Sequence, residues 1–165
     1  MTLIELFNLG MMRKYSEPLP NKEGVVLNLG AGNKSIPNTI EHDWPQWDAN
    51  FHSLPYDENS VDMIHCYHLL EHLSNPVHCL GEIAYVLKPL SHVNIVVPYY
   101  NSSLQAQDLD HKCSFTEHTF RTLFDRVYYD KDKLQPMKIH TNFIMADEEK
   151  NLCLIVQLQK IAVDQ

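Results

Sequence analysis

The chain has 165 residues, 44% of them hydrophobic and 21% charged, which suffices for one hydrophobic core and argues against a large multidomain protein. Thirteen basic and 21 acidic residues give a formal net charge of -8. A surface of this charge repels polyanions, so we expect neither nucleic acid nor an anionic membrane as a partner. A small or neutral ligand is expected instead.

No apolar run approaches the ~18 to 20 residues that a membrane-spanning helix needs. Glu5 and Asn8 also interrupt the N-terminal stretch where a signal peptide would be apolar. We therefore expect a cytoplasmic chain that is not exported. The cysteines have no paired or regular spacing that would indicate a zinc ribbon or a disulfide framework. Reduced thiols, mostly in the core, are expected at Cys66, Cys79, Cys113 and Cys153.

The first half of the chain predicts a helix followed by short strands. Thr2 and Glu5 have the spacing of a capping box, so residues 1–24 are expected to form a helix and a loop. The apolar run 25–29 predicts a buried strand, and residues 39–42 predict a second strand after a short connection.

The middle of the chain predicts a strand, a helix and another strand. Residues 61–66 and 92–97 are the two apolar strands. Between them, Asn75 is placed to cap a helix that has Pro76 in its first turn and that Lys88-Pro89 ends.

The last third predicts a helix and a hairpin. Thr116 is placed to cap a helix, and Phe115 and Phe120 have the positions of a hydrophobic staple. Alternating residues over 139–145 and the run 152–158 then predict an antiparallel hairpin. The whole pattern indicates one α/β domain, residues 1–165, folded as a Rossmann-like three-layer sandwich with a mostly parallel sheet and a C-terminal antiparallel hairpin.

Parallel sheets of this kind bind ligands beyond the carboxyl ends of their strands. The first strand runs directly into Gly30 and Gly32, where the lack of a Cβ lets the backbone turn sharply and approach a ligand. Such a turn also occurs without any ligand. A dinucleotide is not expected, because Pro37 and the short connection leave no room for the helix that faces a pyrophosphate.

Polar and aromatic side chains follow the next strand. Asp43 ends it where a carboxylate can accept hydrogen bonds from both hydroxyls of a ribose, although a surface turn also accounts for it. Asn50, beside Phe51, offers an amide that can recognise an adenine edge. Trp44 and Trp47 are more often explained by core or loop packing than by stacking on a ligand ring.

These segments together resemble a known family. The matching motifs are, in order, NLGAGN, IEHD, ANFHSLPYDENSVDMIHCYHLLEHL, GEIAYVLKP, VNIVVP and DLDHKCSFTEHTF. They resemble the motifs of class I S-adenosylmethionine-dependent methyltransferases, and of the compact methyltransferase-11-like group in particular, over about residues 25–124. The resemblance implies S-adenosylmethionine as the cofactor. It implies cofactor contacts at Gly30, Ala31, Gly32, Asp43 and Asn50. Further candidate cofactor contacts are Asn28, Trp44, Phe51 and His68.

The chain departs from the family's pattern at three places. Asn50 replaces the usual aspartate at the adenine position, where its carbonyl oxygen can still accept one hydrogen bond. Asn33 replaces a third glycine in the first turn. The family's KPGG turn reads Lys88-Pro89-Leu90-Ser91 and loses both glycines, so a differently shaped turn is expected there.

Two polar groups are candidates for catalysis. His68, Glu71 and His72 follow the strand at 61–66 and would share one face of a helix, and the resemblance places Glu71 and His72 at the substrate pocket. Asp110 and His111 resemble a family region over the substrate opening, and a polar loop that caps the next helix is the alternative.

The string from His68 to His72 also matches the HxxEH pattern of a zinc peptidase. A zinc site needs a third protein ligand, and the sequence alone does not identify one. We therefore expect no metal.

The expected function is methyl transfer from S-adenosylmethionine to an oxygen or nitrogen nucleophile of a small-molecule acceptor. The alternative is an S-adenosylmethionine-binding scaffold or regulatory subunit without turnover of its own. Because so short a chain covers only part of a substrate, a second copy or a partner chain is expected to complete the pocket.

Overall fold

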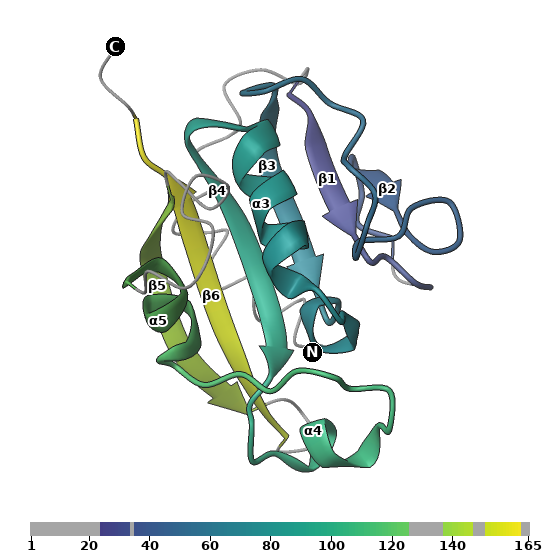
Figure 1. Ribbon diagram of the computed structural model, residues 1–165, viewed down its shortest axis with the longest axis vertical. Helices are drawn as coiled ribbons and strands as arrows, with labels where there is room; N and C mark the ends of the chain where they lie inside the picture. The colour runs from purple at the N-terminus through teal and green to yellow at the C-terminus, as the bar shows by residue number, and fades with distance from the viewer. Residues whose placement is uncertain (1–23, 34, 126–136, 147–150, 163–165) are drawn as a thin grey trace.

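The computed structural model describes residues 24–33, 35–125, 137–146 and 151–162. Their strands form one six-stranded sheet in the order β2-β1-β3-β4-β6-β5 (Figure 1). The first four strands in this order run parallel, and β6 is antiparallel to both of its neighbours. The strands are β1 (Val26–Leu29), β2 (Ile40–His42), β3 (Val61–Tyr67), β4 (Leu87–Pro98), β5 (Met137–Ala146) and β6 (Leu152–Lys160).

This sheet confirms the predicted α/β class, with its mostly parallel sheet and antiparallel C-terminal pair. The strands begin and end close to the predicted positions, except that β4 starts earlier than expected, at Leu87. Residues 88–91 form an irregular stretch within β4, because Val61 pairs with Leu87 while Met63 pairs with His92. Leu90 has a left-handed φ of 67° in this stretch. The expected turn is therefore a bulge far from the carboxyl ends of the strands.

The helices are α3 (Pro76–Val86), α4 (Ser103–Gln107), α5 (Thr119–Asp125) and the 3₁₀ turn η2 (Leu70–His72). Helices α3 and α5 lie on the same face of the sheet (Figure 1). As predicted, Pro76 opens α3 and the Asn75 side chain accepts a hydrogen bond from the backbone of His78. At the other end of α3, the buried Lys160 ammonium donates to the carbonyls of Ala84 and Tyr85 at 2.6 and 3.2 Å. This cation satisfies carbonyl groups that the helix end leaves without partners.

Helix α5 begins at Thr119, three residues after the predicted cap Thr116. The Thr116 hydroxyl still accepts a hydrogen bond from the backbone of His118. The rings of Phe115 and Phe120 stack with centroids 5.9 Å apart, so the predicted staple contact is confirmed. The predicted N-terminal helix lies outside the described residues.

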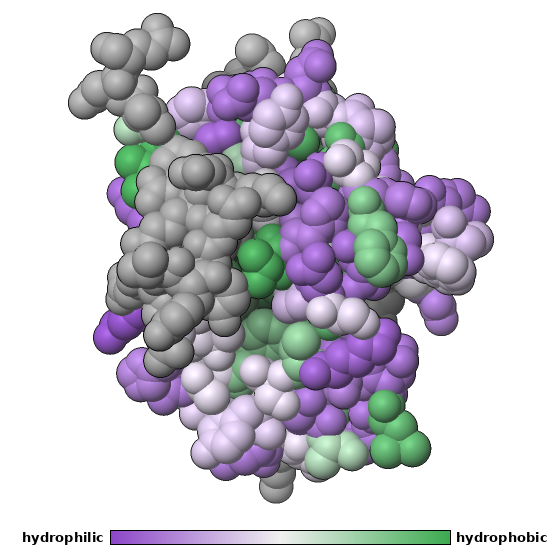
Figure 2. All heavy atoms as spheres, in the orientation of Figure 1, coloured by the Kyte–Doolittle hydropathy of each residue, from purple (hydrophilic) through white to green (hydrophobic). Residues whose placement is uncertain are grey.

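Apolar side chains form a core on each face of the sheet. The larger core joins β1, β3, β4 and β6 to α3 and α5, and the smaller one lies around Tyr67, Val96, Cys153 and Ile155. On the described part of the face seen in Figure 2, hydrophobic residues appear only as separate patches between hydrophilic ones. All four cysteines are free thiols and three are buried, which confirms the prediction. Among the described helices, none is long and apolar enough to cross a membrane.

A row of buried polar side chains crosses the sheet on the face of the smaller core. On neighbouring strands, Asn28 lies beside His65, His65 beside Asn94, and Asn94 beside Gln157. Each of these residues is at most 3% exposed. Gln157 Nε2 donates to Asn94 Oδ1 at 2.8 Å, and His65 Nδ1 lies 2.9 Å from the Tyr67 hydroxyl. Burial lowers the pKa of His65 to about 4, so this imidazole is neutral in the folded protein.

The burial of His65 in this row predicts that the folded protein loses stability as the pH falls. The unfolded chain binds a proton at His65 below pH 6.5 while the folded chain resists it down to about pH 4, so stability is lost as the pH falls through this window. Between pH 7 and 4.5 the wild type should lose about 2 to 3 kcal/mol more unfolding free energy than His65→Gln. Urea unfolding at both pH values measures this difference, with the exposed His118→Gln as control. Equal losses in all three proteins would contradict the role of His65.

Candidate functional site

The carboxyl ends of β1, β2 and β3 open into a pocket of about 460 Å³. This is the edge of the sheet where the sequence placed a ligand site. The pocket's lining comes from the glycine turn after β1, the loop after β2, the segment after β3 and a loop far along the chain. The lining residues are Gly30, Gly32, Asp43, Trp44, Trp47, Asp48, Ala49, Asn50, His68, Leu69, His72, Leu73, Asp110 and Lys112.

The glycine turn is tight on one side and open on the other. Gly30 and Gly32 have left-handed φ values of 69° and 53°, which favour glycine. A Cβ on Gly30 would lie 2.9 Å from the Cβ of Leu69, whereas a Cβ on Gly32 would meet nothing within 4 Å. The backbone at Gly32 is therefore exposed to the pocket, where a ligand can approach it closely.

Asp43 joins the two turns that form this wall of the pocket. One of its carboxylate oxygens accepts a hydrogen bond from Gly32 N at 2.6 Å, and the other accepts one from Trp44 N at 2.9 Å. Each carboxylate oxygen has a further lone pair that can accept. Asp43 is thus positioned as predicted at the end of β2, and it also holds the glycine turn in place.

Asn50 lines the pocket, but its side chain already has partners. Its Oδ1 accepts hydrogen bonds from the backbone of Ser74 and Asn75 at 2.8 and 3.0 Å, and its Nδ2 donates to Asp48 at 3.0 Å. Both lone pairs of Oδ1 are therefore used to hold the start of α3. This oxygen therefore has no free lone pair for the predicted hydrogen bond from an adenine amino group.

Asp48 is a pocket carboxylate that the sequence analysis did not identify. Its Oδ1 accepts hydrogen bonds from the backbone and side chain of Asn50. The Asn50 backbone hydrogen bond lowers the pKa of Asp48, and the Asn50 side chain adds to this effect. The group is therefore an anion in the pocket wall. The signal available in the sequence was only its position two residues before Asn50.

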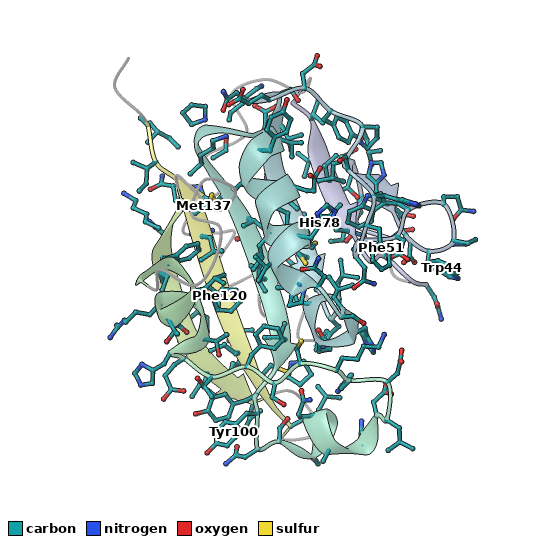
Figure 3. All side chains as sticks on the ribbon, in the orientation of Figure 1. Trp44, Phe51, His78, Tyr100, Phe120 and Met137 are labelled. Atoms are coloured by element: carbon teal, nitrogen blue, oxygen red, sulfur yellow. The ribbon has the colours of Figure 1, made fainter. Side chains whose placement is uncertain are left out.

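The other predicted cofactor residues are not all in the pocket. Trp44 lines it and is 71% exposed, whereas Phe51 is 74% exposed and is not a lining residue. Figure 3 shows both side chains on the loops beside β2, with Trp44 at the outer edge of the molecule. Asn28 and Ala31 are buried and do not line the pocket. His68 lines it with a left-handed φ of 54°.

The shared helix face expected for His68, Glu71 and His72 is not formed. His68 lies before the 3₁₀ turn η2, which contains only Leu70–His72. The side chains of His68 and Glu71 nevertheless meet, with His68 Nδ1 3.1 Å from Glu71 Oε1. Glu71 is fully buried, and its Oε2 has no partner among the described residues.

A distant loop brings the second predicted catalytic pair to this turn. The carbonyl of Glu71 accepts hydrogen bonds from Lys112 N and Cys113 N at 2.7 and 3.1 Å. Asp110 Oδ2 consequently lies 3.6 Å from His72 Nδ1, and the rings of His72 and His111 contact each other with centroids 4.7 Å apart. The structure thus groups all four predicted catalytic residues at one edge of the pocket.

Comparisons with known proteins identify a matching domain family and solved structures of similar fold. A methyltransferase domain family matches residues 28–95. A chain of the complex between a Haloferax volcanii methyltransferase and its Trm112 activator is 14% identical, with 96% of this chain and 92% of that chain covered and a TM-score of 0.66. A Methanosarcina mazei S-adenosylmethionine-dependent methyltransferase is 15% identical, with 93% and 98% covered and a TM-score of 0.65.

A third solved structure, named as the cyclase SpnF, is 12% identical, with 85% of this chain and 76% of that chain covered and a TM-score of 0.59. At these identities the solved structures show the shared fold. No curated protein matches the chain. With the domain match, the shared fold confirms the predicted resemblance to class I S-adenosylmethionine-dependent methyltransferases, which implies S-adenosylmethionine as the cofactor.

The pocket has the features that this cofactor requires. The open space over Gly32 admits a ligand against the backbone, and Asp43 presents a carboxylate at the end of β2. Both residues line the same cavity. A nucleoside with a positively charged sulfonium therefore meets an anionic, concave surface.

The two glycines predict different effects of one substitution. Gly30→Ala should destabilise the fold, because the new Cβ clashes with Leu69 in addition to its left-handed φ. Gly32→Ala carries only the backbone cost of about 1 kcal/mol, and it should mainly weaken ligand binding by placing a methyl group in the pocket. Thermal unfolding with and without S-adenosylmethionine measures both effects. Equal loss of stability in the two variants would contradict this assignment.

Proposed function

We propose that this chain, which resembles class I S-adenosylmethionine-dependent methyltransferases in motifs, domain match and fold, methylates an oxygen or nitrogen nucleophile of a small-molecule acceptor. The observation that carries the proposal is the pocket itself, which has an open glycine turn and carboxylates on one wall and titratable side chains on another. When bound, S-adenosylmethionine supplies an electrophilic methyl group. The chain's own residues have to bind the cofactor and the acceptor, orient them toward each other and remove the acceptor's proton.

The glycine turn and two carboxylates are the proposed cofactor-binding wall. Asp43 would accept hydrogen bonds from ribose hydroxyls through the lone pairs that Gly32 and Trp44 leave free. Asp48 is the proposed acceptor for the adenine amino group, because its carboxylate lines the pocket while the Asn50 oxygen is already used. Asn50 then acts by holding Asp48 in position.

The polar edge formed by His72 and Asp110 is proposed to accept the proton of the methyl acceptor. His72 and Asp110 both line the pocket, and their side chains lie 3.6 Å apart. A general base within reach of a protonated nucleophile raises the rate of transfer. The His111 ring contacts the His72 ring and is proposed to orient it. The Glu71 side chain contacts His68, another pocket residue, and is proposed to orient that imidazole.

We further propose that a second chain covers the open side of the pocket. Trp44 and Phe51 are 71% and 74% exposed beside it, and large exposed apolar side chains beside a site are typical of interaction surfaces. The Haloferax volcanii neighbour was solved in complex with a methyltransferase activator. That complex supports a partner chain as the covering element here.

A second candidate function is an S-adenosylmethionine-binding scaffold or regulatory subunit without turnover. The hydrogen bonds of Asn50 favour this function. Its amide oxygen, the predicted contact for adenine, instead accepts hydrogen bonds from the backbone of Ser74 and Asn75. The neighbour named as a cyclase is an example of this fold in a protein named for another reaction.

Calorimetry on the full chain with S-adenosylmethionine and S-adenosylhomocysteine tests the binding wall. Asp43→Asn replaces one acceptor oxygen by an NH₂ group that faces a backbone N–H, so affinity should fall about 10-fold or more. Asp48→Asn should also weaken binding. The matched control is the exposed Asp57→Asn, which should bind as the wild type does.

If neither compound gives a heat of binding with the folded chain, the cofactor assignment is refuted. Binding without formation of S-adenosylhomocysteine, against a broad panel of oxygen and nitrogen acceptors and with any co-purifying chain present, would favour the scaffold.

A further inference from the structure

We propose that Glu71, His72 and His111 bind a divalent first-row transition metal ion, with zinc as the preferred ion, at the edge of the pocket. Each residue offers one ligand atom, and these atoms lie within 4.8 Å of one another. Two imidazoles with a carboxylate suit zinc and iron, whereas magnesium and calcium prefer oxygen ligands. The proposal departs from the sequence-based expectation of no metal, because the third ligand is supplied by a distant loop.

The carboxylate of Glu71 is the strongest indication of a bound cation. Its side chain is fully buried, and one oxygen faces His68 Nδ1 at 3.1 Å. The other oxygen, Oε2, is buried without a hydrogen-bond partner among the described residues. An unsatisfied carboxylate oxygen in the interior is costly unless it is paired or coordinates a metal. A cation between Glu71 and the two imidazoles removes this cost.

His111 has the outer contact that metal-binding histidines have. Its Nδ1 lies 3.2 Å from the carbonyl of Gln105, so this nitrogen donates and Nε2 carries the lone pair. A backbone carbonyl bonded to the second nitrogen fixes the tautomer and strengthens the ligand. Carboxylates lie near both rings, with Asp110 Oδ2 3.6 Å from His72 Nδ1 and Asp108 Oδ2 3.7 Å from His111 Nε2.

The backbone holds these ligands together before any ion binds. Lys112 N and Cys113 N both donate to the carbonyl of Glu71, and Cys113 Sγ lies 3.3 Å from the carbonyl of Leu73. Zinc bonds of about 2.1 Å separate tetrahedral ligands by roughly 3.4 Å, so only a small rotation of the side chains closes the site. Three protein ligands leave a coordination position for an exchangeable ligand.

A role for the metal in methyl transfer rests on the proposed function, whereas the binding of the metal does not. His72 lines the pocket, so an ion held by this residue would adjoin the space that we propose for the acceptor. A hydroxyl bound to zinc loses its proton more readily. The imidazole of His72 would then act as a ligand rather than as a base.

The test is zinc binding by the untagged full chain, freed of metal with a chelator, using a chromophoric zinc competitor. One equivalent should bind, and His111→Ala should weaken binding about 100-fold or more. The matched control is His118→Ala, which removes an imidazole that is 68% exposed and should leave affinity unchanged. Circular dichroism verifies folding, and the cobalt spectrum of the wild type, with bands from nitrogen and oxygen ligands, gives a second readout if a variant unfolds.

Failure to bind zinc, or equal weakening by His111→Ala and His118→Ala, would overturn the site. A cobalt spectrum with thiolate charge-transfer bands would also overturn it. Calorimetry with S-adenosylmethionine on the same sample separates the two proposals. Cofactor binding without zinc removes only the metal, and zinc binding without cofactor leaves the metal site and removes the methyltransferase proposal.

Discussion

The glycine turn after β1 is held between the ends of two neighbouring strands, and the pocket is built around it. Strand β1 pairs in parallel with both β2 and β3, so its carboxyl end has a neighbour on each side. Gly30 N donates to the carbonyl of His42 at the end of β2, and Gly30 lies against Leu69 after β3. Asp43 then fixes Gly32. The turn has little freedom to move, so its exposed face is available to a ligand without rearrangement.

A second backbone constraint positions another part of the pocket lining. The carbonyl of Glu71 accepts hydrogen bonds from the backbone N–H groups of Lys112 and Cys113, more than forty residues later, which brings Asp110 and His111 to His72. Burial of Glu71 excludes water from its carboxylate and strengthens its interactions with nearby charges. The same contacts therefore organise the polar edge, whether it acts as a base or as a metal site.

The structure also shows that residues chosen for ligand contact can be occupied by the fold. Asn50 uses its amide to hold the start of α3 and the Asp48 carboxylate. Asn28 lies in the buried row with His65, Asn94 and Gln157. Sequence position alone does not distinguish these roles, because the outcome depends on which donors and acceptors lie within hydrogen-bond distance.

The order of the elements was predictable because hydrophobic periodicity, glycine and proline act locally. Asn75 and Pro76 begin α3, and Phe115 contacts Phe120, as the sequence indicated. The glycine turn and Asp43 were likewise found at the ends of their strands. The early start of β4 was not predicted, because its bulge depends on pairing with β3.

The sequence by itself determined the order of the strands and of the helices α3 and α5, the edge of the sheet that carries the pocket and the residue types available there. The tertiary structure decided which of them meet. It placed His111 beside His72, used the Asn50 amide oxygen to hold the start of α3, and left Phe51 outside the pocket. Local patterns depend on neighbours along the chain, whereas these contacts depend on backbone hydrogen bonds between segments far apart in sequence.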